Sequence, residues 1–193
     1  IRTLPYIEAW HEKYSKKSLV IIGVHTPEFE FAKERKNLEE AVKKFGLKYP
    51  VVMDNDYSIW GSWNNSYWPR KFLVDSKGVV RYDHAGEGEY GKSEQKIQEL
   101  LLEKDPDLKL PEIMEPVREE DMPGAVCYPV TPETYCGFSR GRLGNPEGYK
   151  TYGEFEYKDP REHFDGEIYL KGRWLAFPEF LQYKGSYESD YLA

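Results

Sequence analysis

The stretch that decides the fold is Tyr67-Trp68-Pro69-Arg70-Lys71-Phe72-Leu73-Val74-Asp75-Ser76-Lys77-Gly78-Val79-Val80-Arg81-Tyr82. Two apolar runs flank the turn residues Asp75 to Gly78, and this pattern predicts a β-hairpin. Proline cannot donate a hydrogen bond within a sheet, so Pro69 belongs at the first position of its strand. The bond between Trp68 and Pro69 is also of the kind at which a cis peptide costs little free energy. The sequence therefore predicts a hairpin entered through a cis-proline.

Helical and extended patterns alternate on both sides of this hairpin. The elements expected, in order, are a helix at residues 5–17, a buried parallel strand at 19–24, a helix at 31–45, a strand at 49–53, a short helix ending at 60, the hairpin, and a helix at 93–104. Gly46 should end the second helix, and Asp54-Asn55-Asp56 should cap the short one. Alternation of this kind predicts an α/β sandwich, and its first strand is expected to be missing from this chain because the pattern begins on a helix.

In the second half of the chain the helical periodicity fades. Residues 105–132 contain prolines at 106, 111, 116, 123, 129 and 132, which predicts an extended linker lying along a surface. Beyond it, aromatic residues interrupted by Gly and Pro predict short strands. The expected organisation is therefore a domain at residues 1–104, a proline-rich linker at 105–132 and a partial β-rich module at 133–193.

Composition excludes some functions and leaves others open. The chain has 193 residues, a net charge of −7 and 32% charged residues, which argues against a general nucleic-acid binder. Cys127 and Cys136 lie nine positions apart and form no Cys-x-x-Cys motif, so they are expected to be half-buried thiols or a local disulfide. The four histidines have no metal-site spacing, and no metal or cofactor is expected. The start at Ile1, without an initiator Met or a signal-peptide pattern, suggests a piece of a longer protein.

Five segments, in this order along the chain, resemble a known family: Ile1-Arg2-Thr3-Leu4-Pro5-Tyr6, Ile22-Gly23-Val24-His25-Thr26-Pro27-Glu28-Phe29, Asp54-Asn55-Asp56-Tyr57, Tyr67-Trp68-Pro69 and Gly86-Glu87-Gly88-Glu89-Tyr90. Residues 1–104 resemble the thioredoxin-like family in its TlpA and AhpC/TSA-like branch, and within it the periplasmic C-terminal region of DipZ-type cytochrome c biogenesis proteins. Thr131 to Tyr135 and the Gly172-x-Trp174 segment resemble the β-rich, carbohydrate-binding-like module that follows in that family.

The resemblance implies a thioredoxin-like sandwich and a thiol:disulfide oxidoreductase that acts on protein thiols or disulfides. In this family a Cys-x-x-Cys pair opens the first helix, where the helix N-terminus lowers the thiol pKa. The matching positions fall just before Ile1, so no catalytic residue is expected within this chain. Substrate binding is expected at Trp68 and Pro69, the alternative being that the two only close a turn. The resemblance also implies an extracytoplasmic location, periplasmic or at the cell surface, and a membrane electron-transfer protein as partner.

Three other signals leave alternatives open. His25 and Glu28, with Glu30, follow the predicted buried strand and could assist proton transfer, or could be ordinary loop polarity. Residues 86–93 match the phosphate-loop pattern G-x-x-x-x-G-K-[ST], but Glu87 and Glu89 would place carboxylates where phosphates sit, so a glycine-rich turn is favoured.

The aromatic residues of the β-rich module could stack on a sugar or could form its core. The alternative function is accordingly a non-catalytic protein- or glycan-binding module.

Overall fold

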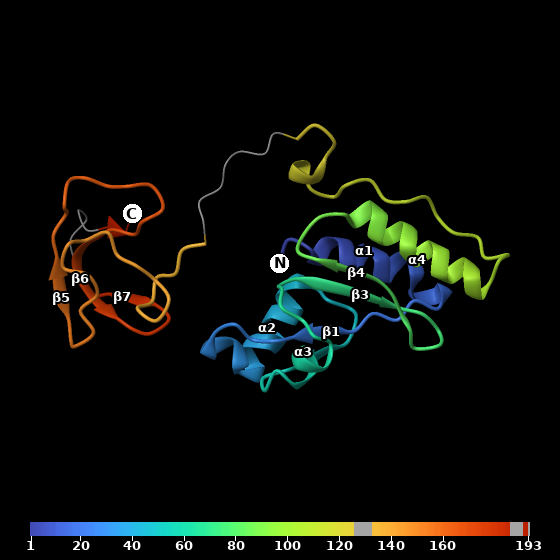
Figure 1. Ribbon diagram of the computed structural model, residues 1–193, viewed down its shortest axis with the longest axis horizontal. Helices are drawn as coiled ribbons and strands as arrows, with labels where there is room; N and C mark the ends of the chain where they lie inside the picture. Colours follow the sequence, from blue (N-terminus) through green and yellow to red (C-terminus); the bar gives the residue numbers. More distant parts are fainter. Residues whose placement is uncertain (126–132, 186–190, 193) are drawn as a thin grey trace. The chain divides into compact units, whose positions relative to one another are not determined.

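The computed structural model describes residues 1–125, 133–185 and 191–192, and the chain divides into two units, Ile1–Cys127 and Tyr128–Ala193. Helices and strands alternate in the first unit (Figure 1). Its elements are α1 (Leu4–Tyr14), η1 (Ser15–Lys17), β1 (Gly23–His25), η2 (Glu30–Lys33), α2 (Arg35–Phe45), β2 (Val51–Met53), α3 (Ser58–Ser62), β3 (Arg70–Val74), β4 (Val80–Ala85), α4 (Tyr90–Lys104) and η3 (Glu119–Asp121). The mixed helix and sheet architecture confirms the predicted α/β fold class.

The core of the first unit lies between α1 and α4. Tyr6, Trp10 and Tyr14 recur every fourth residue, which places them on one face of α1, and all three are buried. They pack against Ile97 and Leu101 of α4. The helix predicted at residues 5–17 is thus confirmed as α1 followed by the 3₁₀ turn η1.

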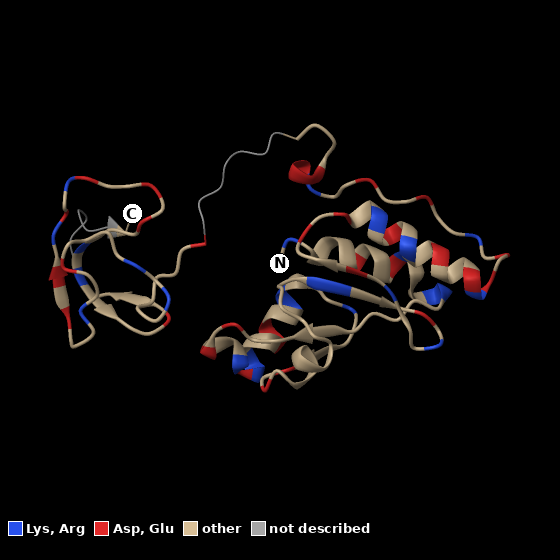
Figure 2. Cartoon of the chain, in the orientation of Figure 1, with Lys and Arg blue, Asp and Glu red and all other residues tan. Residues whose placement is uncertain are grey.

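The four strands of the first unit form two pairs. β1 pairs in parallel with β2, and β3 pairs with β4 in an antiparallel hairpin. Within the described residues, each of these strands has one neighbour. Figure 2 shows Lys and Arg alternating with Asp and Glu along α2 and α4, and a basic start to β3.

The predicted buried strand at residues 19–24 is wrong in its bounds and in its burial. β1 covers only Gly23–His25, and the side chains of Val20 and Ile22 are 76% and 59% exposed. Leu19 and Ile21 do pack on the helical core, because alternate residues of an extended segment face opposite sides. No element of the described chain covers the other side, so the apolar run is only half buried.

Two helix bounds also differ from the prediction. The segment expected as one helix at 31–45 consists of η2 and α2, because Glu34 between them has extended backbone angles. Gly46, at a φ of +64°, ends α2 as expected. The last helix begins at Tyr90 instead of residue 93, directly after Glu89, which has a φ of +50°.

Residues 105–125, here called the strap, lie along α1 and α4 in extended form (Figure 1). Leu108, Leu110 and Met114 of the strap pack against the helical core. The strap thus lies on a surface, as the prolines predict, except that η3 interrupts its extended path. The division into a domain at 1–104 and a linker at 105–132 stays a prediction, and residues 126–132 lie outside the described part.

The second unit is built on a small antiparallel sheet. Its strands are β5 (Phe155–Tyr157), β6 (Leu170–Ala176), β7 (Leu181–Tyr183) and β8 (Tyr191–Leu192), with β6 paired to the other three. The core includes Leu143, Tyr157, Leu170 and Trp174. The prediction of short strands is confirmed. Cys136 is a free, half-buried thiol, and Cys127 lies outside the described residues.

Candidate functional site

The hairpin β3–β4 positions the predicted substrate-binding loop. Its turn is closed by Asp75, whose side chain accepts hydrogen bonds from the amides of Lys77 and Val79. The Trp68–Pro69 bond is cis, as predicted. The Pro69 carbonyl accepts a hydrogen bond from the Gly86 amide at 2.7 Å, which fixes the loop to the residue that follows β4.

The indole ring of Trp68 is held from two sides. Its Nε1–H donates to the Thr26 carbonyl at 3.1 Å, and its ring lies 4.2 Å from the ring of Trp60, centroid to centroid. The residue is nevertheless 51% exposed. Its own amide and carbonyl make no hydrogen bond to any other residue that the structure describes. Trp68 therefore combines a side chain that is fixed by two contacts with peptide groups that have no hydrogen-bond partner among the described residues.

Asp54 organises the residues behind Trp68. Its buried carboxylate accepts hydrogen bonds from the amides of Ile59 and Trp60 at 2.9 and 2.8 Å, and from the Thr26 hydroxyl at 3.0 Å. Burial alone would raise the pKa of Asp54, but these bonds, with one from the Ser58 hydroxyl, hold that pKa below its ordinary value. Asp54 thereby caps α3, as predicted, and also ties α3 to Thr26.

A short chain of contacts joins the loop to the first turn of α1. Glu87, next to the Gly86 that bonds Pro69, pairs with Arg2 at 3.5 Å. The Tyr90 hydroxyl lies 3.3 Å from the Thr3 hydroxyl, and Thr3 is the residue that precedes α1. The segment at residues 86–90 thus contacts both the Trp68–Pro69 loop and the residues at the start of α1. Figure 1 shows that β3, which follows this loop, begins near the N-terminus of the chain.

The other polar candidates lie in the neighbouring loop. His25 ends β1, and its Nε2 is 2.9 Å from the Ala32 carbonyl, so the ring is turned into the loop that follows β1. Glu28 is an exposed residue of that same loop. An accessory role of these two residues in proton transfer stays a prediction.

The glycine-rich segment forms the turn between β4 and α4. Gly86 and Gly88 both have positive φ angles, which glycine adopts without strain. Lys92 lies within α4 and pairs with Glu89 at 3.6 Å. Both carboxylates of the segment therefore have cationic partners in the protein itself, since Glu87 pairs with Arg2.

The described residues hold no group of three or more His, Cys, Asp or Glu side chains arranged to bind a metal ion. None of the helices in this part of the chain is long and apolar enough to cross a membrane.

The family assignment follows from comparison with known proteins. The family model described as Redoxin matches residues 1–101, more than half of the chain. The chain belongs to the Redoxin family. This thioredoxin-like assignment agrees with the predicted family, and thiol-disulfide oxidoreductases are among the relatives.

The relatives of this Redoxin chain align with different shares of its length. Protein DipZ of Mycobacterium bovis is 34% identical over 189 residues, which are 96% of this chain and 26% of DipZ. The chain thus spans about a quarter of the length of that relative. Thiol-disulfide oxidoreductase YkuV of Bacillus subtilis is 23% identical over 100 residues, covering 52% of this chain and 67% of YkuV. A solved thioredoxin-like protein in the oxidized form aligns with a TM-score of 0.49 at 22% identity, over 53% of this chain and 68% of its own.

In the second unit, Trp174 occupies the core. It is 9% exposed, and its indole N–H donates to the Lys171 carbonyl at 2.9 Å. The structure thus favours the core interpretation for this ring, whereas Tyr152 is 96% exposed. Glycan binding by the second unit stays a prediction.

Proposed function

We propose that this chain is the thiol:disulfide oxidoreductase domain of a larger protein and acts on protein disulfides. Its reactive cysteine pair directly precedes Ile1 in the intact protein. The observation that supports the proposal is the connection of the α1 N-terminus to the Trp68–Pro69 loop through the neighbouring residues Gly86 and Glu87, which contact Pro69 and Arg2.

The chemistry requires a thiolate at the start of α1. A helix N-terminus favours negative charge, so it lowers the pKa of a thiol placed there. The first thiolate attacks a substrate disulfide and forms a mixed disulfide, and one substrate thiolate leaves. The second cysteine then attacks the mixed disulfide and releases the other substrate thiol, so the enzyme is oxidised and the substrate reduced. The same steps in reverse oxidise a substrate dithiol.

Trp68 supplies the binding edge in this mechanism. Its free amide can donate to, and its carbonyl accept from, the backbone of an extended substrate segment, which is how peptides add to an exposed edge. The bonds from Trp68 to Thr26 and Trp60 fix the direction of that edge before substrate arrives. A fixed edge lowers the entropic cost of binding.

The unpaired edges of β1 and β3 also support the proposal that further residues precede α1. β1 and β3 each have one partner in the described chain, and Val20 and Ile22 lie uncovered beside them. A strand leading into α1 from the preceding residues would pair at these edges, and further upstream residues would cover the apolar side chains. This is the first strand expected for the fold.

The proposal extends to location and partner. By its resemblance to the DipZ-type group, the domain works outside the cytoplasm and exchanges electrons with a membrane protein. A domain that reduces disulfides must have its dithiol restored, and one that oxidises dithiols must have its disulfide restored. It therefore needs a redox partner, because each turnover changes the redox state of the pair.

An insulin-reduction assay tests the proposal. The chain extended at Ile1 by its native upstream residues is compared with the same chain carrying serines in place of the upstream cysteines, and with residues 1–193 alone. The extended chain should accelerate insulin reduction by dithiothreitol, and the other two should not. An upstream sequence without a cysteine pair, or equal rates for the extended chain and its serine version, would identify a non-catalytic binding module instead.

A further inference from the structure

Lys71 is a half-buried cation near the start of β3. Its Nζ donates to the Gly86 carbonyl at 3.2 Å and lies 5.3 Å from the centroid of the Tyr90 ring. Among the residues that the structure describes, no carboxylate comes within ion-pair distance of this ammonium. The charge of Glu87 acts on Lys71, but the Glu87 carboxylate pairs with Arg2 at 3.5 Å.

The ring of Tyr90 connects Lys71 with α1. Tyr90 stacks on Tyr6 of the first helical turn, with centroids 3.6 Å apart and an interplanar angle of 6°. Its hydroxyl lies 3.3 Å from the Thr3 hydroxyl. Both Tyr90 and Thr3 are buried. Lys71 is therefore linked to the first turn of α1 through the ring of Tyr90, which it contacts and which in turn contacts Tyr6 and Thr3.

A cation removed from water costs free energy unless an anion compensates it. The state of Lys71 fits this cost, because burial lowers the pKa of its ammonium despite the opposing charge of Glu87. A carbonyl and an aromatic ring are weaker partners than a carboxylate. The position thus lacks the anion that a half-buried lysine ordinarily has.

We propose that the ammonium of Lys71 is the countercharge of the catalytic thiolate at the start of α1. This inference rests on the proposed function and names a positioning residue for it. The thiol proton leaves to water, and Lys71 stays protonated and forms no covalent bond. By reciprocity, the thiolate raises the pKa of Lys71 as much as Lys71 lowers that of the thiol.

The other groups facing Lys71 contribute less to this effect. Arg2 is exposed and already paired with Glu87, so solvent and its partner screen it. His84 stands opposite Lys71 in the hairpin, and its Nε2 lies 3.1 Å from the Glu87 carbonyl oxygen. Tyr90 contributes its ring face, which is neutral.

The test measures the thiol pKa in the extended chain that contains the upstream cysteine pair. The rate of alkylation by iodoacetamide is followed against pH, because only the thiolate reacts. Lys71→Met should raise the thiol pKa by about one unit, a roughly tenfold loss of thiolate at a pH below it, and Lys71→Arg should restore the original value. Lys77→Met, which removes an exposed lysine of the hairpin turn, is the matched control and should change nothing.

The results of these measurements distinguish the role of Lys71 from the proposed oxidoreductase function on which it rests. Full insulin reduction with an unchanged thiol pKa in Lys71→Met overturns the role of Lys71 alone. An extended chain without reductase activity overturns the proposed function and this inference together. Should Lys71→Met fail to fold, Lys71→Gln keeps a donor for the Gly86 carbonyl and carries the same expectation.

Discussion

The carboxylate of Glu94 accepts a hydrogen bond from the main-chain amide of Met114 at 2.9 Å, and so ties α4 to the strap. Glu94 is 0% exposed, and its other oxygen accepts from the Lys13 ammonium and the Tyr14 hydroxyl. A buried carboxylate with this set of donors is satisfied, and each donor depends on it in turn. One side chain thereby joins two helices and the segment that follows them.

Glu94→Gln should destabilise the chain by about 3 kcal/mol, because the new amide NH₂ must face either the Met114 amide or the Lys13 and Tyr14 donors, and Lys13 loses the negative charge that it pairs with. The free energy of unfolding in urea measures this loss. Glu99→Gln is the matched control, since Glu99 is exposed and its ion pair among the described residues is with Lys96. Its effect should stay below about 0.5 kcal/mol. Equal effects of the two substitutions would contradict the role of Glu94.

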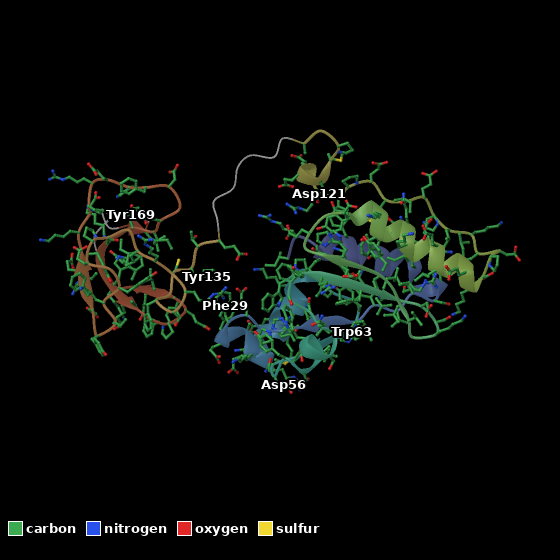
Figure 3. All side chains as sticks on the ribbon, viewed as in Figure 1. Phe29, Asp56, Trp63, Asp121, Tyr135 and Tyr169 are labelled. Carbon is green, nitrogen blue, oxygen red and sulfur yellow. The ribbon has the colours of Figure 1, made fainter. Side chains whose placement is uncertain are left out.

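The strap should behave as part of the first unit. A chain that ends at residue 104 loses the packing of Leu108, Leu110 and Met114, worth about 1 kcal/mol each for partly buried side chains. It also loses Asp121, which accepts a hydrogen bond from the Tyr6 hydroxyl at 2.6 Å and is labelled on η3 in Figure 3. The urea midpoint of residues 1–104 should therefore lie clearly below that of residues 1–125. Coincident unfolding curves would show that the strap is only a connector.

Asp54 should make stability depend on acid pH. Its pKa in the folded chain lies below the unfolded value of about 3.9, so the stabilisation is complete above that value and is lost as the pH falls through the folded pKa. The Asp54→Asn variant lacks this titrating group. Its amide NH₂ replaces one of the two oxygens and so faces either the Ile59 or the Trp60 amide, which costs about 2 kcal/mol at neutral pH.

The measurement for Asp54 is the free energy of unfolding from neutral to acid pH in both proteins. The difference between them should shrink as the pH falls, because the other acids titrate in both. A difference that stays constant into the acid range would contradict the hydrogen-bonded carboxylate.

Trp60 should support substrate binding through Trp68. In the extended chain, Trp60→Ala removes a ring contact worth about 1 kcal/mol and frees the Trp68 side chain, so kcat/KM for a peptide disulfide should fall about fivefold, mainly through KM. A small organic disulfide makes no backbone contacts and should be reduced at an unchanged rate. Trp63, labelled in Figure 3, packs on Phe72 with centroids 5.0 Å apart, and Trp63→Ala is the matched control. An equal loss in both variants would mean that the effect is general.

Local signals in the sequence predicted the local features. The hairpin, the stop at Gly46 and the cap at Asp54 each depend on residues a few positions apart, and the structure contains all three. The burial of residues 19–24 failed as a prediction because it depends on which elements cover each side of the segment. An apolar run carries no information on that point.

The part of the site that the sequence did not indicate is made of distant contacts. Tyr90 meets Thr3 across 87 positions, and Glu94 meets Tyr14 across 80. Lys71 is an ordinary polar residue in the alternating pattern of a strand, and only the packing of Tyr90 against Tyr6 reveals its surroundings. No motif or spacing encodes these neighbours, so the countercharge proposed for the thiolate could come only from the structure.

Trapping a mixed disulfide tests the central claim most directly. The chain extended by its upstream residues, with the second cysteine of the pair replaced by serine, is incubated with an oxidised cysteine-containing peptide and analysed by non-reducing mass spectrometry. The account predicts one added peptide, attached to the first upstream cysteine and released by reductant, and a much lower yield when Trp68 is replaced by proline, which has no amide to donate. Attachment to Cys127 or Cys136 instead, or no reductant-sensitive adduct, would contradict it.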